Sequence, residues 1–238
     1  MKILAFDTSS EWCSVALQRD GQVCSRETHA GQRHSELIIA MIDALLMESG
    51  VRVADLEAIA FGAGPGSFTG LRIACGIAQG LAFGADLPVA CVSTLLAVAE
   101  ATQAQRVIVA LDARMSELYY AAYERTNDRW RTVHAPRLCV PTATPEVEGG
   151  GWIGAGTGFA VHADALAQHY AGQVIGTRPE LHPSARAVAS LGAQMVRDGL
   201  AVPADDAQPL YLRDRVALTI VERQALKAQK TNAPAGNS

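Results

Sequence analysis

The stretch FGAGPGSFTGLRIACGIAQGLAFG, residues 61–84, decides the fold of this 238-residue chain. It begins with a glycine-rich turn, residues 62–67, whose glycines can adopt positive φ and leave backbone N–H groups unshielded, while Pro65 stiffens the turn. Residues 68–83 carry one charge, Arg72, and predict a helix that is covered over most of its surface. The turn therefore joins a strand to a helix that needs burial on more than one side.

Small residues recur at every fourth position of this helix. They are Gly70, Ala74, Ala78 and Ala82, with Leu71 and Cys75 beside them. Residues spaced by four share one face, so another helix can approach this stripe closely. One face can meet the protein's own sheet, and we expect a second apolar face to need a cover.

A second helix with too little polar surface is predicted at residues 35–49 (SELIIAMIDALLMES). Glu36 in its first turn suits the helix dipole, and Gly50 ends it. Between residues 37 and 47 the only polar side chain is Asp43, so the apolar arc is wider than a surface helix requires. This helix also lacks an obvious cover.

The amino-acid composition and charge indicate a globular protein of a reducing compartment. The apolar share of 49% is ample for a buried core, and the net charge of −4 gives no general attraction for nucleic acid. Five cysteines without a CxxC pair indicate free thiols in a reducing compartment. Asp7 falls too early for a signal-peptide core, and no apolar run is long enough to span a bilayer. We therefore expect a cytoplasmic protein.

The rest of the chain predicts two similar halves. In the first half, strands are predicted at residues 2–6, 13–18, 22–28, 55–61 and 88–92, with a short helix at 94–101. After a polar break at 103–105, strands are predicted at 106–111, 117–123, 131–140 and 152–154, with helices at about 162–170 and 185–199. The segments AFDTSS and ALDARM occupy the same place in each half. This repetition predicts a duplicated α/β fold, each lobe a mixed sheet with flanking helices. The expected lobes are residues 1–104 and 105–224. We also expect a short strand or cap at Tyr211–Arg213 and a disordered tail at residues 225–238.

Two aspartates end equivalent strands, Asp7 and Asp112. On opposite walls of a cleft they could hold a magnesium–phosphate group or act as a base. The alternative is that each caps a turn through neighbouring amides. A candidate nucleotide or phosphate loop consists of Asp7, Thr8, Ser9, Gly64 and Gly66. The turn lacks the Gly-Lys-Ser/Thr ending of phosphate loops, so a tight strand-to-helix connection is the equal alternative.

Other catalytic arrangements find little support in the residue pattern. The six histidines form neither HxxxH nor HExxH, which argues against a helical metal site within this chain. Ser67 lies in no GxSxG context and has no His or Asp partner that the sequence can place.

Several segments resemble the bacterial TsaB (YeaZ) family. They are KILAFDTSSEWCSVAL, GAGPGSFTGLRIACGIAQGLA, LPVACVSTL, ALDARMSELYYA and QPLYLRD. The resemblance implies the duplicated actin/sugar-kinase/heat-shock-chaperone (ASKHA) fold. It also implies a non-catalytic subunit that binds and stabilises TsaD. Together with the ATPase TsaE, TsaD transfers threonylcarbamoyl from its adenylate to the adenosine beside the anticodon of tRNA.

The same resemblance places doubt on catalysis by this chain. TsaD-like subunits hold a metal with two histidines four residues apart, and alignment on VSTLLAVA puts Thr94 and Val98 at those positions. Neither side chain binds a metal as imidazole does. We therefore expect no catalytic residue and no resident metal. The alternative is a small-molecule kinase or ATPase that uses Asp7 and the Gly64–Gly66 turn.

The resemblance also supplies a cover for the two apolar helices. If they lie side by side, the equivalent helices of TsaD would complete the contact, through Leu37, Ile38, Met41, Leu45, Leu71, Ala74, Cys75 and Ala78. The alternative is burial of both helices under the second lobe. Without TsaD we expect a homodimer through the same patch. No firmly bound cofactor is expected, although ATP or ADP or Mg at the partner interface is a candidate, and tRNA is a substrate of the complex rather than of this chain.

Overall fold

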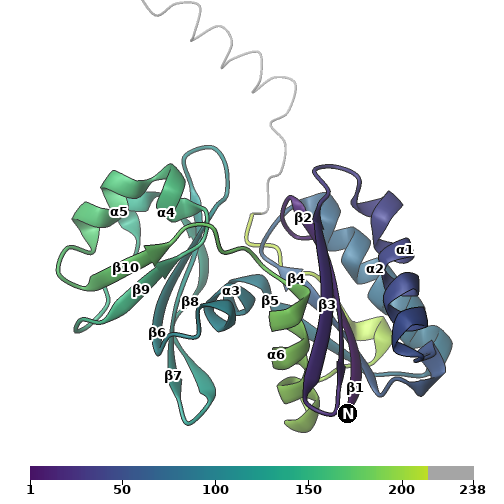
Figure 1. The fold of residues 1–238 in the computed structure, drawn as a ribbon. Helices are drawn as coiled ribbons and strands as arrows, with labels where there is room; N and C mark the ends of the chain where they lie inside the picture. The colour runs from purple at the N-terminus through teal and green to yellow at the C-terminus, as the bar shows by residue number, and fades with distance from the viewer. Residues whose placement is uncertain (214–238) are drawn as a thin grey trace, which may run out of the picture.

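The computed structural model describes residues 1–213, which form two lobes side by side (Figure 1). The first lobe holds a five-stranded sheet of β1 (Lys2–Asp7), β2 (Trp12–Arg19), β3 (Gln22–His29), β4 (Ala58–Gly64) and β5 (Val89–Ser93). Its strand order is β3-β2-β1-β4-β5. β1 runs parallel to β4 and antiparallel to β2, so the sheet is mixed.

The second lobe repeats this topology. Its strands are β6 (Arg106–Asp112), β7 (Leu118–Thr126), β8 (Arg129–Cys139), β9 (Trp152–Ala155) and β10 (Val174–Arg178). Read from its other edge, the order β10-β9-β6-β7-β8 becomes β8-β7-β6-β9-β10, which is that of the first sheet with every strand number raised by five. β6 is antiparallel to β7 and parallel to β9, as β1 is to β2 and β4. The expected duplicated two-lobe α/β fold is confirmed.

Helices cover both faces of each sheet. α1 (His34–Ser49) and α2 (Phe68–Ala85) lie on the outer face of the first sheet, and α4 (Gly158–Val161) and α5 (Ala163–His169) cover the second (Figure 1). Three short 3-10 turns occur at Val53–Asp55, Pro141–Ala143 and Ala204–Asp206. Because α2 is long and apolar, it meets the length and composition of a membrane span, contrary to the expectation from the sequence. This is weak evidence, since core helices meet the same criterion and one side of α2 packs on the first sheet.

The two remaining helices are exchanged between the lobes. α3 (Thr94–Thr102) follows the first sheet, yet Leu95, Val98 and Ala99 pack on the second. α6 (Ala185–Arg197) follows the second sheet but packs on the first, where an added Cβ on Gly192 would lie 2.6 Å from that of Ala60. The two helices also contact each other, so a common core joins the lobes.

This exchange corrects the expected lobe boundaries. The chain does pass to the second sheet between α3 and β6, as the polar break at 103–105 predicts. However, residues after α6 stay with the first lobe, where Val202 pairs with Val89 of β5. The expected second lobe of residues 105–224 is therefore too long by at least α6 and the segment that follows it. Residues 211–213 form no strand, and the expected tail at 225–238 lies outside the described residues.

Candidate functional site: the glycine turn, the interlobe cavity and the outer helical face

The glycine-rich turn packs directly against the turn that follows β1. The backbone N–H of Ser67 donates to the carbonyl oxygen of Ser9 at 2.8 Å. A Cβ added to Gly66 would lie 2.5 Å from that same oxygen. The N–H of Ser67, the N-cap residue of α2, is thus bonded to the chain's own carbonyl group and is not free to bind an anion.

One turn further along α2 the contact is closer still. Thr8 donates its hydroxyl to the carbonyl oxygen of Gly70 at 2.7 Å. A Cβ added to Gly70 would lie 1.8 Å from the carbonyl oxygen of Thr8. Ser67 caps the helix by accepting from the Gly70 N–H at 3.3 Å. The glycines therefore serve a tight strand-to-helix connection, which was one of the two interpretations of the sequence.

Asp7 is fully buried beneath this connection. Its Oδ1 accepts hydrogen bonds from the backbone N–H and the hydroxyl of Ser9, both at 2.8 Å, while Oδ2 has no partner among residues 1–213. Oδ2 faces Gly62, where an added Cβ would come within 1.7 Å of it. Burial raises the pKa of Asp7, although the bonds from Ser9 lower it in part. Asp7 caps its own turn and does not face open space.

The raised pKa of Asp7 predicts a pH-dependent effect of Asp7→Asn. The folded protein keeps a proton that the unfolded chain, with an ordinary pKa of 3.8, releases earlier. The wild-type free energy of unfolding should therefore fall as the pH rises from 3.8 through the folded-state pKa. The Asn variant lacks this fall, so its stability relative to wild type should be higher at pH 7 than at pH 4. Urea denaturation of both proteins at the two pH values measures the difference, and parallel pH profiles would contradict it.

Asp112, at the end of β6, holds the position equivalent to Asp7 but faces the space between the lobes. Its Oδ1 accepts from the backbone N–H of Arg114 at 3.0 Å, and its Oδ2 lies 3.5 Å from the guanidinium of that residue. Its own N–H donates to the hydroxyl of Thr157 at 3.0 Å. Asp112 thus caps a turn and makes a local ion pair. With Asp7 enclosed, the two carboxylates do not form a shared clamp for magnesium phosphate.

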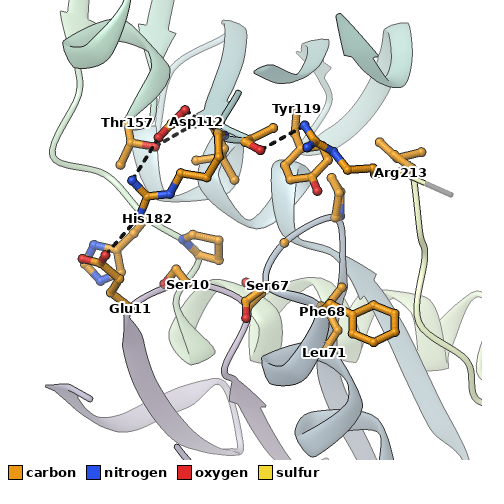
Figure 2. A pocket seen from close by; sticks show the side chains of 18 of the residues that line it. Ser10, Glu11, Ser67, Phe68, Leu71, Asp112, Tyr119, Thr157, His182 and Arg213 are labelled. Atoms are coloured by element: carbon orange, nitrogen blue, oxygen red, sulfur yellow. Dashed lines mark hydrogen bonds and ion pairs between the residues drawn. The ribbon is translucent and has the colours of Figure 1, made fainter. Parts of the chain in front are cut away.

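A cavity of about 740 Å³ separates the lobes. Phe68 and Leu71 line it from the first lobe, and Asp112, Tyr119 and Thr157 from the second (Figure 2). Further lining comes from Ser9–Trp12, 65–67, 179–180, 182–183 and 210–213. Within residues 1–213, no three His, Cys, Asp or Glu side chains cluster as a metal site would require.

The side chains of α1 and α2 that are exposed to a partner differ from those expected from the sequence. Six of the eight expected contact residues are buried, with exposed fractions of at most 7%; five pack in the first lobe's own core, and Leu71 lines the interlobe cavity. The six are Ile38, Leu45, Leu71, Ala74, Cys75 and Ala78. Leu37 and Met41 are half-buried at the side of α1. The small stripe of α2 lets the helix pack closely on its sheet rather than on another helix, and this corrects the expected contact set.

The opposite side of the two helices carries exposed apolar side chains, and on α1 the exposed Asp43 lies between two of them, Ile39 and Met47. Ile39, Met47 and Phe83 are 54%, 75% and 76% exposed. Between them on α2, Gly76 and Gly80 are exposed, and an added Cβ at either would meet no atom within 4 Å. We call these residues, with the half-buried Ile73 and Ile77, the outer face. The alternative that the second lobe buries both helices is excluded for this face.

The two positions aligned with metal-binding histidines lie in the protein interior. Thr94 donates its hydroxyl to the carbonyl oxygen of Pro65, and Val98 packs among the apolar side chains of the second sheet. Both side chains are fully buried. Thr94 thereby ties the start of α3 to the glycine-rich turn, which is a structural role.

Comparisons with known proteins agree on one relationship. A family model described as "TsaD: tRNA N6-adenosine threonylcarbamoyltransferase" matches residues 26–219. The Escherichia coli (strain K12) protein described as "tRNA threonylcarbamoyladenosine biosynthesis protein TsaB" is 40% identical over 225 residues, or 91% of this chain and 96% of that protein. The Haemophilus influenzae protein of the same description is 37% identical over 229 residues, with 91% and 95% covered.

A solved structure gives the same result in three dimensions. YeaZ from Pseudomonas aeruginosa superimposes with a TM-score of 0.83 at 36% sequence identity, and the match covers 89% of this chain and 99% of that one. A second Pseudomonas aeruginosa structure, described as an uncharacterized protein with similarity to peptidase YEAZ, matches with the same values.

Proposed function

This chain belongs to the TsaB (YeaZ) family, and we propose that it is the accessory subunit that binds and stabilises TsaD for threonylcarbamoyl transfer to tRNA. Its relationship to TsaB proteins supports a role in tRNA threonylcarbamoyladenosine biosynthesis. The further statement, that it acts by binding TsaD and has no catalysis of its own, is our proposal.

The bare outer face is the observation that carries the proposal. Large apolar side chains, Met47 and Phe83, remain about three-quarters exposed on helices that already cover their own sheet. Large exposed apolar side chains on the same pair of helices favour protein association. Gly76 and Gly80 allow the backbone of a partner helix to approach α2 closely, because no side chain stands in between.

We propose TsaD as the partner, and the match of a TsaD family model to residues 26–219 supports a common fold for the two proteins. A subunit with the same duplicated fold would present helices equivalent to α1 and α2, and packing of the two pairs gives a four-helix contact. In the absence of TsaD, we propose that two copies of this chain pair through the same outer face.

The alternative kinase or ATPase function finds less support in the geometry. The N–H of Ser67 is bonded to the carbonyl oxygen of Ser9, and Asp7 is enclosed. Neither group can reach a phosphate without rearrangement of the core, so the residues do not fit a phosphate loop. We further propose that ATP or ADP with Mg binds at the interface with TsaD and that TsaE is a third subunit. tRNA is then the substrate of the complex, and the proposed location is cytoplasmic.

Size-exclusion chromatography with light scattering tests the proposed function. The chain alone should elute as a self-associated species and hydrolyse no ATP. Addition of TsaD should convert it into a heterodimer, whose mass identifies one copy of each subunit. ATP turnover by the chain alone that Asp7→Ala abolishes would favour the kinase alternative, and separate elution of the two proteins would contradict the scaffold proposal.

A further inference from the structure

The last described residues, 210–213, run along the interlobe cavity and touch both lobes; we call them the strap. Leu210 donates its backbone N–H to the carbonyl oxygen of Ala63, at the end of β4, at 2.7 Å. The ring of Tyr211 lies 5.2 Å from that of Phe68, and its hydroxyl accepts from Nε of Arg72 at 3.1 Å. The first half of the strap is therefore bound to the first lobe, at β4 and the first turn of α2.

Arg213 binds the strap to the second lobe. Its Nη2 donates to the carbonyl oxygen of Ala113 at 3.0 Å and to Oε2 of Glu117 at 2.6 Å, and Nη1 lies 3.0 Å from the sulfur of Met115. Its side chain is only 16% exposed. All three contacts fall on one loop, residues 113–117, which joins β6 to β7, and Figure 2 shows the guanidinium reaching this loop beside Tyr119.

The loop that Arg213 holds has an unusual backbone. Arg114, Met115 and Ser116 have φ of 63°, 55° and 59°. Three successive left-handed residues with side chains are unfavourable, and such conformations persist where surrounding contacts over-determine them. Because Arg213 contacts residues at both ends of the loop, it supplies such contacts from outside the loop itself.

Two other ion pairs between the lobes are more exposed at their arginine: Arg129 of β8 binds both carboxylate oxygens of Asp198, after α6, with its side chain 63% exposed. Arg114 reaches Glu11 of the first lobe at 3.4 Å, but the two side chains are 77% and 64% exposed. Exposed ion pairs contribute little to stability, whereas a largely buried arginine with several charge-assisted bonds contributes more. The apolar packing of α3 and α6 also joins the lobes, so the strap is a second connection, along the cavity.

We propose that the strap is a latch that fixes the angle between the lobes, with Arg213 as the positioning residue. While Arg213 is bound, the strap and the 113–117 loop close one side of the cavity. Its release leaves the lobes joined by the packing of α3 and α6 and lets the cavity widen. Because the strap also contacts Phe68 and Arg72 on α2, lobe angle and partner docking are coupled; this last step rests on the proposed function.

Amide hydrogen exchange on the full chain tests the latch without a partner. The reporters are the amides of Ala113, Glu117 and Leu210, each hydrogen-bonded across the loop or the strap. Arg213→Ala should accelerate their exchange by about tenfold or more, since the loop loses the contacts that hold its left-handed backbone in place. Amides of β9, in the core of the second lobe, should keep their wild-type rates. Small-angle scattering of the monomer should show a larger radius of gyration for Arg213→Ala.

Two further variants keep the test decisive. Arg52→Ala removes an exposed arginine whose partner, Asp55, is in the same lobe, and it should leave all three reporters and the radius unchanged. Tyr211→Phe removes only the hydroxyl bonded to Arg72, and it should accelerate exchange at Leu210 alone. Unchanged reporter amides in Arg213→Ala would overturn the latch. Equal acceleration throughout both lobes would also overturn it, because it would assign Arg213 a general role in stability. Neither result bears on TsaD binding.

Discussion

Gly76→Arg is expected to abolish binding of the chain to TsaD while the fold remains intact. Gly76 lies in the middle of α2 on the outer face, where an added Cβ meets no atom within 4 Å. Arginine is favoured over glycine in an exposed helix interior by roughly 0.5–1 kcal/mol, so the variant should be no less stable. In a closed apolar contact the same side chain would bury an unpaired charge at a cost of about 3 kcal/mol, or roughly 100-fold in Kd.

Isothermal titration with TsaD measures this effect, and Ile175→Arg is the matched control. Ile175 is 72% exposed, but it lies on β10 at the far edge of the second lobe (Figure 1). The control should bind like wild type, and thermal melting should confirm that both variants are folded. Equal affinity of Gly76→Arg and wild type would remove the outer face as the docking site.

Gly70→Ala and Gly76→Ala should have opposite effects on stability, although they make the same change in the same helix. At Gly70 the new Cβ would lie 1.8 Å from the backbone oxygen of Thr8, which cannot rotate away. We expect the free energy of unfolding to fall by about 3 kcal/mol or more. At Gly76 the Cβ enters open space, and the gain in helix propensity should raise the free energy of unfolding by up to about 1 kcal/mol.

Urea denaturation of these two variants tests whether the glycine-rich turn is a structural connection. The result depends on how closely α2 packs against Thr8 and Ser9, the arrangement in which the Ser67 N–H is bonded to Ser9. If Gly70→Ala were as stable as wild type, the turn would be loose enough to open. In that case the phosphate-loop interpretation would regain support.

The order of elements was predictable because the signals are local. Hydrophobic runs ended by turn residues predicted the strands of both sheets except β10, and Gly50 does end α1 in the left-handed conformation. β10 was missed because its residues, VIGTR, are mostly exposed and alternate poorly. The exchange of α3 and α6 between the lobes was not predictable, since an apolar helical face does not specify which sheet it covers.

The candidate site was predicted at the level of helices but not of side chains. The stripe of Ala74 and Ala78 was interpreted as a surface for another helix, but a flat stripe also lets α2 lie close on its own sheet, and both residues are fully buried. The outer face carries Gly76 and Gly80, which have no side chain to produce an apolar pattern. Ile73, Ile77 and Phe83 were the apolar signals on that side of α2. The contacts of Arg213 depend on the tertiary fold and had no local signal.

Reconstituted threonylcarbamoyl transfer to tRNA tests the central claim most directly. The assay combines TsaD, TsaE, tRNA and threonylcarbamoyl-adenylate, with and without this chain, and measures the modified adenosine. We predict efficient modification with the wild-type chain, little with Gly76→Arg or without the chain, and none with the chain alone. Modification of tRNA by the chain alone, or an equal yield when it is omitted, would contradict its assignment as the accessory subunit.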